Sequence, residues 1–255
     1  MLRYLEAHPP AAVRRSGTLL LLHAFPLNSK MWEPQLGLAD GGWRIIAPDL
    51  TQGGTSTTMD DFAGAVVDLL DGLHVEDVVL GGCSMGGYLA LALTRLAERY
   101  VRGLVLIDTR AQADPPEAIE NRKKTLQLVN DKGTPAIIED MIPKLLGETT
   151  KRTRPDVVER VRAIGLANSK ESVAGMVRAL MTRADSTALL PKIHLPTLIV
   201  VGAEDTITPP AMSEQMHGAI AGSELVILPE VGHLSSLEDP VAFNQTVSKF
   251  LEHRL

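Results

Sequence analysis

The sequence predicts an α/β domain with a mostly parallel central sheet and helices on both faces of that sheet. Three observations predict it: short apolar runs recur along the chain, segments with helical periodicity separate them, and turn residues follow each run. Short apolar runs bounded by turn residues are typical of buried parallel strands. Their alternation with helices favours crossover connections, and therefore a parallel sheet.

Six apolar runs are the predicted strands. They are Thr18–Phe25, Arg44–Leu50, Asp77–Ser84, Arg102–Asp108, Pro196–Gly202 and Ser223–Leu228. A loop, Thr51–Thr57, follows the second strand. A helix is predicted at Met59–Leu73, because apolar residues recur at helical spacing behind a Thr58-x-x-Asp61 capping pattern. A second is predicted at Met85–Arg99, where arginines in the later turns favour the helix dipole.

The segment Ala111–Leu190 interrupts this alternation. It has helical periodicity, no strand-like run and no Phe, Trp or Tyr, and it holds 13 Lys/Arg and 11 Asp/Glu residues. We expect a helical cap at 111–190 inserted into a core formed by 1–110 and 191–255, because a strand follows at Pro196. Three ordinary crossover helices are the alternative.

The strongest chemical signal is Gly82-Cys83-Ser84-Met85-Gly86, between a predicted strand and a predicted helix. A serine on such a sharp turn stands clear of the sheet as a nucleophile, and the flanking glycines allow the backbones to approach. The helix N-terminus directs N–H groups toward a developing oxyanion. The run lacks both dinucleotide-binding and phosphate-loop spacing. Cys83 is expected to be an inert buried thiol.

A serine nucleophile needs a base, and the base needs an orienting acid. His233 follows the last predicted strand, at the sheet edge where Ser84 is expected. The histidines expected to be solvated or remote are His8, His74, His194, His217 and His253.

For the acid, Asp205 follows the penultimate strand, and the order Ser84, Asp205, His233 is the one this motif predicts. Asp108 ends the strand after the serine's helix and is a real competitor, whereas Glu204 is less favoured.

Composition excludes several classes of protein. A net charge of −6 argues against a nucleic-acid binder. One cysteine excludes a disulfide framework and a cysteine-based zinc site. No apolar run is long enough to span a membrane, and Met1–Gly17 carries charges and prolines where a secretory signal is apolar. These features predict a cytoplasmic enzyme or binding protein.

The chain resembles the α/β-hydrolase superfamily, and more narrowly small capped carboxylesterases and 3-oxoadipate enol-lactonase-like hydrolases. The matching motifs are His23-Ala24-Phe25-Pro26, Ala47-Pro48-Asp49-Leu50, Gly82-Cys83-Ser84-Met85-Gly86-Gly87, Gly202-x-x-Asp205 and Gly232-His233. The resemblance implies the α/β-hydrolase fold with a helical cap, and an oxyanion hole formed by the backbone N–H groups of Phe25 and Met85. His23 is more often structural in this motif than catalytic.

The chain departs from the family pattern at two places. Ala24 replaces the usual glycine, and Thr51-Gln52-Gly53-Gly54-Thr55-Ser56 replaces the usual Arg-Gly-x-Gly-x-Ser. The second change removes an arginine and a turn glycine at the rim of the expected site, so it bears on the substrate rather than on the catalytic set.

We therefore expect a serine hydrolase that cleaves a small ester or lactone through an acyl-enzyme, with no metal or organic cofactor. The alternatives are a C–C hydrolase or cofactor-free perhydrolase or haloperoxidase with the same triad, and a signalling or binding protein on this scaffold. A monomer or homodimer is expected. Aliphatic cap residues are expected to line the acyl pocket. The candidates are Met141, Ile142, Leu145, Met176, Leu180 and Met181.

Overall fold

The computed structural model describes residues 2–50 and 58–255. The predicted loop Thr51–Thr57, and with it the departure from the family motif at residues 51–56, lies outside the described residues.

Within the described residues, seven strands form one sheet in the order β1-β3-β2-β4-β5-β6-β7. Their bounds are β1 Tyr4–Ala7, β2 Gly17–Leu22, β3 Trp43–Pro48, β4 Val78–Cys83, β5 Val101–Ile107, β6 Thr197–Gly202 and β7 Glu224–Leu228. All neighbouring strands are parallel except β1, which pairs antiparallel with β3. The predicted mostly parallel α/β fold is confirmed. The sequence reading missed β1, an edge strand of four half-buried residues.

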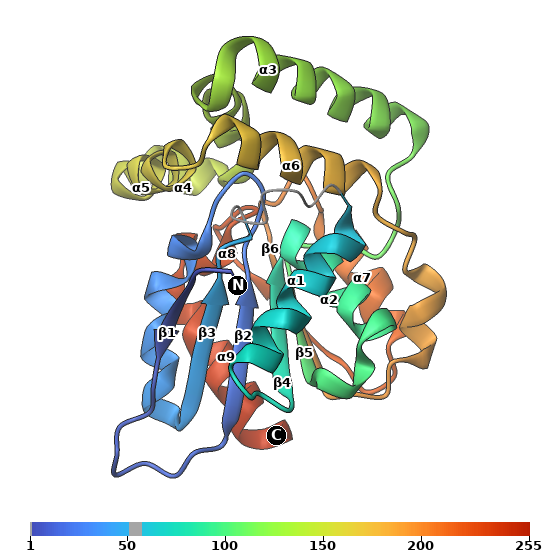
Figure 1. The fold of residues 1–255 in the computed structure, drawn as a ribbon. Coiled ribbons are helices and arrows are strands. Elements are labelled where there is room, and N and C mark those ends of the chain that lie inside the picture. The colour runs from blue at the N-terminus through green and yellow to red at the C-terminus, as the bar shows by residue number, and fades with distance from the viewer. Residues whose placement is uncertain (1, 51–57) are drawn as a thin grey trace.

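Side chains alternate between the two faces of the sheet, as the pleat of a strand requires. In β2, Leu20 and Leu22 belong to one apolar core, and Leu19 and Leu21 belong to the other. The first core is closed by α1, α2 and α7, and the second by the 3₁₀ helix η1 and by α9 (Figure 1). The bounds are α1 Met59–Gly72, α2 Met85–Leu96, α7 Pro210–Ala219, η1 Ser29–Gly41 and α9 Pro240–Arg254.

Both predicted helices are present but end earlier than predicted. The helix predicted at Met59–Leu73 is α1, which ends at Gly72. The capping pattern before α1 is confirmed, because Thr58 Oγ1 accepts a hydrogen bond from Asp61 N at 3.1 Å and Asp61 Oδ2 accepts one from Thr58 N at 3.0 Å. The helix predicted at Met85–Arg99 ends at Leu96, and the short 3₁₀ helix η3 (Glu98–Tyr100) follows it.

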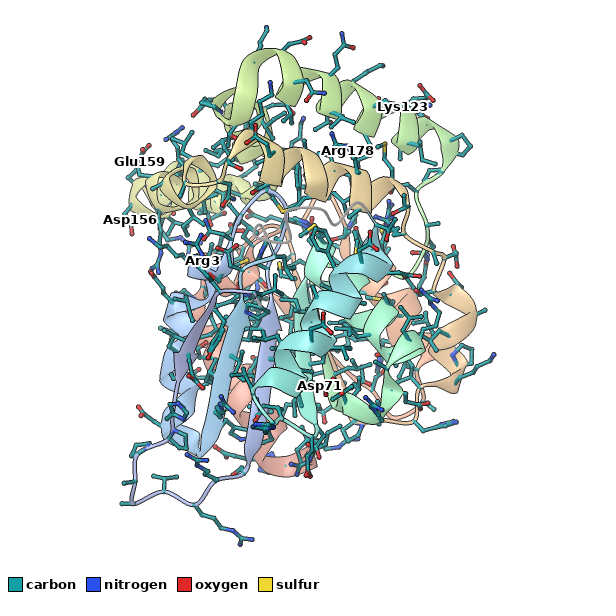
Figure 2. The ribbon with its side chains drawn as sticks, viewed as in Figure 1. Arg3, Asp71, Lys123, Asp156, Glu159 and Arg178 are labelled. Atoms are coloured by element: carbon teal, nitrogen blue, oxygen red, sulfur yellow. The ribbon has the colours of Figure 1, made fainter. Side chains whose placement is uncertain are left out.

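Four α-helices between β5 and β6 lie over the carboxyl ends of the strands (Figure 1). They are α3 Pro116–Leu145, α4 Glu148–Thr153, α5 Pro155–Leu166 and α6 Lys170–Met181. We call residues 111–190 the helical segment. Its longest helix, α3, consists of two parts that meet at Gly133, whose φ of 76° lies in the left-handed region that favours glycine. Charged side chains such as Lys123 of α3 and Glu159 of α5 extend from the outer surface of the helical segment (Figure 2).

Three further short helices occur among the described residues. The helix η4 (Thr187–Lys192) begins at the end of the helical segment, η3 precedes β5, and α8 (Ser235–Glu238) follows the loop after β7. Among the described residues, no helix has both the length and the apolar character needed to cross a membrane.

Candidate active site

The predicted elbow is the sharp turn at Ser84, where β4 ends and α2 begins. Ser84 lies at its apex with φ 51° and ψ −110°, a strained conformation for a residue other than glycine. A Cβ atom on Gly82 would lie 2.2 Å from Gly86 O, and one on Gly86 would lie 2.1 Å from Leu22 O. Only glycine fits at these two positions. The backbone crossing therefore fixes where the serine hydroxyl lies.

Three polar side chains from three different loops form a hydrogen-bonded chain at this edge of the sheet. His233 Nε2 lies 2.8 Å from Ser84 Oγ, and His233 Nδ1 lies 2.7 Å from Asp205 Oδ2. All three residues are buried, with exposed fractions of 8% for Ser84, 1% for His233 and 3% for Asp205. Because Nδ1 faces a carboxylate, we assign the proton to Nδ1, which leaves Nε2 free to accept the Ser84 hydroxyl proton.

Asp205 is held as an anion by its surroundings. Its Oδ1 accepts hydrogen bonds from the amides of Ile207 (2.8 Å) and Thr208 (2.9 Å), and its Oδ2 accepts one from Thr208 Oγ1 at 2.7 Å. Burial opposes the charge. The opposite charge of His233 and the hydrogen bonds from His233 and Thr208 outweigh it and lower the pKa of Asp205.

The same pair shifts the histidine in the other direction. Burial disfavours the imidazolium form of His233, but the charge of Asp205 and its hydrogen bond raise the pKa above its ordinary value. The charges of Asp108 and Glu238 act in the same direction. The site therefore stabilises a positive charge on the imidazole, as a general base requires while it holds a proton.

Asp108, the competing acid, engages other donors. Its Oδ1 accepts a hydrogen bond from Gly202 N at 2.9 Å, and its Oδ2 accepts two from Ser235, from the amide at 3.0 Å and from the hydroxyl at 2.6 Å. Burial and the nearby charge of Asp205 raise the pKa of Asp108 to about 7. The geometry thus favours Asp205 over Asp108 as the partner of His233.

Cys83 and His23, the two other residues considered from the sequence, are both buried within the fold. Cys83 is fully buried with Sγ 3.8 Å from His233 O, and burial, together with nearby carboxylates, raises the pKa of the thiol well above its ordinary value. His23 is also buried. Its Nε2 accepts a hydrogen bond from Leu50 N at 3.0 Å, and its Nδ1 lies 3.1 Å from Ala24 O. Burial lowers the pKa of His23, so the imidazole is neutral and links two loops.

The predicted oxyanion donors come from two segments, the start of α2 and the loop after β2. Met85 is the first residue of α2, so its amide has no acceptor within the helix. Phe25 lies in the loop after β2, where its peptide bond to Pro26 is cis. Asn168 of the helical segment anchors that loop by donating a hydrogen bond to Pro26 O at 2.7 Å. The role of these two amides stays a prediction.

The candidate pocket residues are divided between the two cores. Met176 and Leu180 of α6 belong to the core that contains Phe25 and Met85. Leu145 and Ile142 belong to the other core, whereas Met141 is partly buried and packs against both. Met181 is also partly buried. Contact of any of these residues with a substrate stays a prediction.

Two residues of the site were not found by sequence reasoning. Thr208 binds Asp205, and its position three residues after an aspartate in a turn was a usable signal. Glu238, which binds backbone amides on both sides of His233, gave no signal, because its burial depends on the tertiary fold. Among the described residues, no group of three or more His, Cys, Asp or Glu side chains could hold a metal ion.

Comparisons with known proteins identify the family of the chain. The model of the alpha/beta hydrolase fold family matches residues 17–240. A thermophilic esterase from Thermogutta terrifontis is 37% identical with a TM-score of 0.92, over 98% of this chain and 93% of that one. The 3-oxoadipate enol-lactonase 2 of Acinetobacter baylyi is 27% identical over 92% of this chain and 88% of its own length. A non-heme chloroperoxidase from Kitasatospora aureofaciens is 28% identical over 91% of each chain. The chain belongs to the α/β-hydrolase fold family.

Proposed function

We propose that the protein is a serine hydrolase that cleaves small carboxylic esters or lactones, with Ser84 as nucleophile, His233 as base and Asp205 as orienting acid. One observation carries the proposal: the continuous hydrogen-bonded chain from Ser84 Oγ through His233 to Asp205, at 2.8 and 2.7 Å. Distances of this length are those at which a proton moves directly between nucleophile and base.

In the first half of the reaction, Ser84 Oγ attacks the ester carbonyl carbon while His233 Nε2 takes its proton. Asp205 holds the Nδ1–H tautomer and stabilises the imidazolium that forms. The carbonyl oxygen becomes an oxyanion, which accepts hydrogen bonds from the N–H groups of Phe25 and Met85. Each such donor contributes about 3 kcal/mol to transition-state stability in comparable sites.

The tetrahedral intermediate then collapses. The bond to the alcohol oxygen breaks, His233 gives its proton to that oxygen, and the acyl group stays on Ser84. With a lactone, the alcohol remains tethered to the same acyl group. Water then attacks the acyl carbon, His233 takes the proton of water, and the acid leaves as Ser84 recovers its proton.

The similarity to an esterase and an enol-lactonase supports ester or lactone cleavage over the alternatives. The similarity to a chloroperoxidase keeps perhydrolysis as the second candidate, since peroxide could replace water as acceptor of the same acyl group. A serine rather than an aspartate at the apex argues against chemistry in which a carboxylate attacks carbon.

The test is turnover of p-nitrophenyl acetate and butyrate by the wild type and by Ser84→Ala. We expect turnover by the wild type and none by the variant, with little change in melting temperature. The substitution removes only a hydroxyl group. Adding peroxide separates perhydrolysis from hydrolysis by the appearance of peracid. Equal turnover by both proteins would exclude Ser84, and no turnover of any ester would favour a binding protein.

A further inference from the structure

The loop that carries His233 is held at every one of four consecutive amides. Gly232 N and Leu234 N both donate to Glu238 Oε1, at 2.9 and 3.1 Å. His233 N donates to Leu145 O at 3.1 Å, and Ser235 N donates to Asp108 Oδ2 at 3.0 Å. Two of these four bonds therefore depend on a single carboxylate, Glu238, which the proposed chemistry does not use.

Glu238 also reaches the helical segment. It is 1% exposed, and its second oxygen, Oε2, accepts a hydrogen bond from Gly147 N at 2.9 Å. Gly147 lies at the junction of α3 and α4. A buried carboxylate is costly unless hydrogen bonds compensate its lost hydration, and here three backbone amides do so. One charged group thus bridges the loop of the base and the segment that lies over the site.

The two backbones are in direct contact at this junction. A Cβ atom on Gly232 would lie 2.2 Å from Gly147 N, and one on Gly147 would lie 2.8 Å from Gly232 N and 2.6 Å from Glu204 Oε2. Arg154 of the helical segment also donates hydrogen bonds to the main-chain oxygens of Glu230 and Glu238. The junction is thus fastened on both sides of His233.

We propose that Glu238 is a positioning residue that fixes the backbone around His233 and fastens it to the α3–α4 junction, so that the base and the helical segment keep one relative position. This inference rests on the proposed function, because it takes His233 as the base. Glu238 acts through His233 and is not itself a catalytic residue.

Loss of this bridge would affect the chemical step more than substrate binding. Displacement of a reacting group by about 1 Å is enough to lower a rate by about 100-fold. Glu238 bonds to backbone amides beside the base, so its removal should lower kcat and leave KM nearly unchanged.

The charge of Glu238 provides a second readout. The charged groups that face His233 are Asp205 after β6, Asp108 at the end of β5 and Glu238 of α8, and all three raise the pKa of the imidazole. Neutralising Glu238 therefore lowers that pKa and moves the acid limb of kcat/KM to lower pH. A purely structural loss of folded enzyme would not move the limb.

The experiment compares Glu238→Gln with Gly147→Ala. Glutamine keeps the size of the side chain but presents an NH₂ group to an N–H donor, so at least one bridge is lost. We expect kcat to fall about tenfold or more with KM within about twofold, and the acid limb to shift to lower pH. Gly147→Ala leaves every charge in place and separates the two backbones. We expect the same fall in kcat without the shift.

Glu204→Gln is the matched control. Glu204 also binds the helical segment, through the amide of Thr149 at 2.8 Å and its hydroxyl at 2.6 Å, but its side chain is on none of the four amides of the His233 loop. Its kcat should stay within about twofold of wild type, as expected for a half-exposed hydrogen bond away from the reacting atoms.

Wild-type kcat and an unmoved acid limb in folded Glu238→Gln would overturn the proposal. If that variant does not fold, as judged by circular dichroism, Gly147→Ala is the deciding variant, and a wild-type kcat in Gly147→Ala would likewise overturn the proposal.

The rate at which a fluorophosphonate labels Ser84 separates this inference from the proposed function. A wild type that is labelled but cleaves no ester refutes only the proposed function, and slower labelling of Glu238→Gln then still supports the positioning role. A wild type that is not labelled overturns both.

Discussion

The carboxyl edge of the sheet and the helical segment above it are built from different kinds of contact. At the edge, main chain meets main chain: a Cβ atom on Gly86 would lie 2.1 Å from Leu22 O, and one on Gly202 would lie 2.1 Å from Gly232 O. Within the helical segment, away from the contact of Gly147 with Gly232, a Cβ atom on Gly165 would meet Cδ1 of Ile138 at 2.3 Å, the end of a side chain that can rotate. Main-chain crossings thus set where the candidate reacting groups lie, whereas side-chain packing shapes the segment that covers them.

Among the substitutions that test this contrast, replacing Asp205 at the carboxyl edge of the sheet should have the largest effect on kcat. Asp205→Asn should lower kcat about 10²–10⁴-fold, because the histidine loses the partner that selects its tautomer and stabilises its charge. Asp108→Asn should cost less, since Asp108 binds Gly202 and Ser235 rather than the imidazole. Steady-state kinetics of both variants on p-nitrophenyl butyrate provide the measurement. A greater loss in Asp108→Asn would mean that the acid is misassigned.

The pH dependence of kcat/KM in the wild type tests the role of His233 at the same edge of the sheet. The pKa of His233 is raised, so the protonated and inactive form persists above the ordinary histidine value of about 6.5. Below that raised pKa, kcat/KM should fall about tenfold for each pH unit. Asp205→Asn should move this limb to lower pH, because the charge that raises the pKa is lost. A limb that stays in place in this variant would show that His233 does not control it.

The difference in packing predicts unequal tolerance of an added methyl group. Gly86→Ala should lower the free energy of unfolding by about 1–3 kcal/mol, because the rigid main-chain oxygen of Leu22 cannot move aside. Gly165→Ala should cost less, because Ile138 can change rotamer. Gly64→Ala in α1, where the new Cβ atom meets nothing within 4 Å, is the control and should stabilise the helix by up to about 1 kcal/mol. Urea denaturation measures all three. Equal losses at Gly86 and Gly165 would remove the contrast between the two regions.

The smallest expected effect lies in substrate selectivity. If Met176 and Leu180 line the acyl pocket, Leu180→Val should change the ratio of kcat/KM for octanoate and butyrate esters by about fourfold, the value of one buried methylene. Met176→Leu conserves volume and is the control. Butyrate or octanoate should be preferred over benzoate, because aliphatic walls offer no ring stacking. An unchanged ratio in Leu180→Val, or a benzoate preference in the wild type, would place the pocket elsewhere.

Much of the strand edge was predictable, because its constraints are local in sequence. Apolar runs, glycine spacing and chain order predict six of the seven strands in the described part of the chain, the turn at Ser84 and the loop of His233. The strand β1 was missed because four half-buried residues carry little pattern of their own and depend on the edge of β3 for pairing.

Other features of the site depend on distant parts of the chain. Asp108 and Asp205 follow neighbouring parallel strands, so spacing could not decide between them. The backbone donors that bind Asp108 become visible only in the fold. The bridge through Glu238 to Gly147 joins residues 91 positions apart. The end of α2 at Leu96, three residues before the predicted end, reflects the turn into η3 rather than helix propensity.

The assignment of Ser84 as nucleophile is tested most directly by covalent labelling. Incubation with a fluorophosphonate, followed by intact mass spectrometry and peptide mapping, should show one adduct per chain on Ser84. The adduct should be absent in Ser84→Ala and should form far more slowly in His233→Ala, which lacks the base. An adduct on another residue, or labelling that persists in Ser84→Ala, would contradict the triad of Ser84, His233 and Asp205.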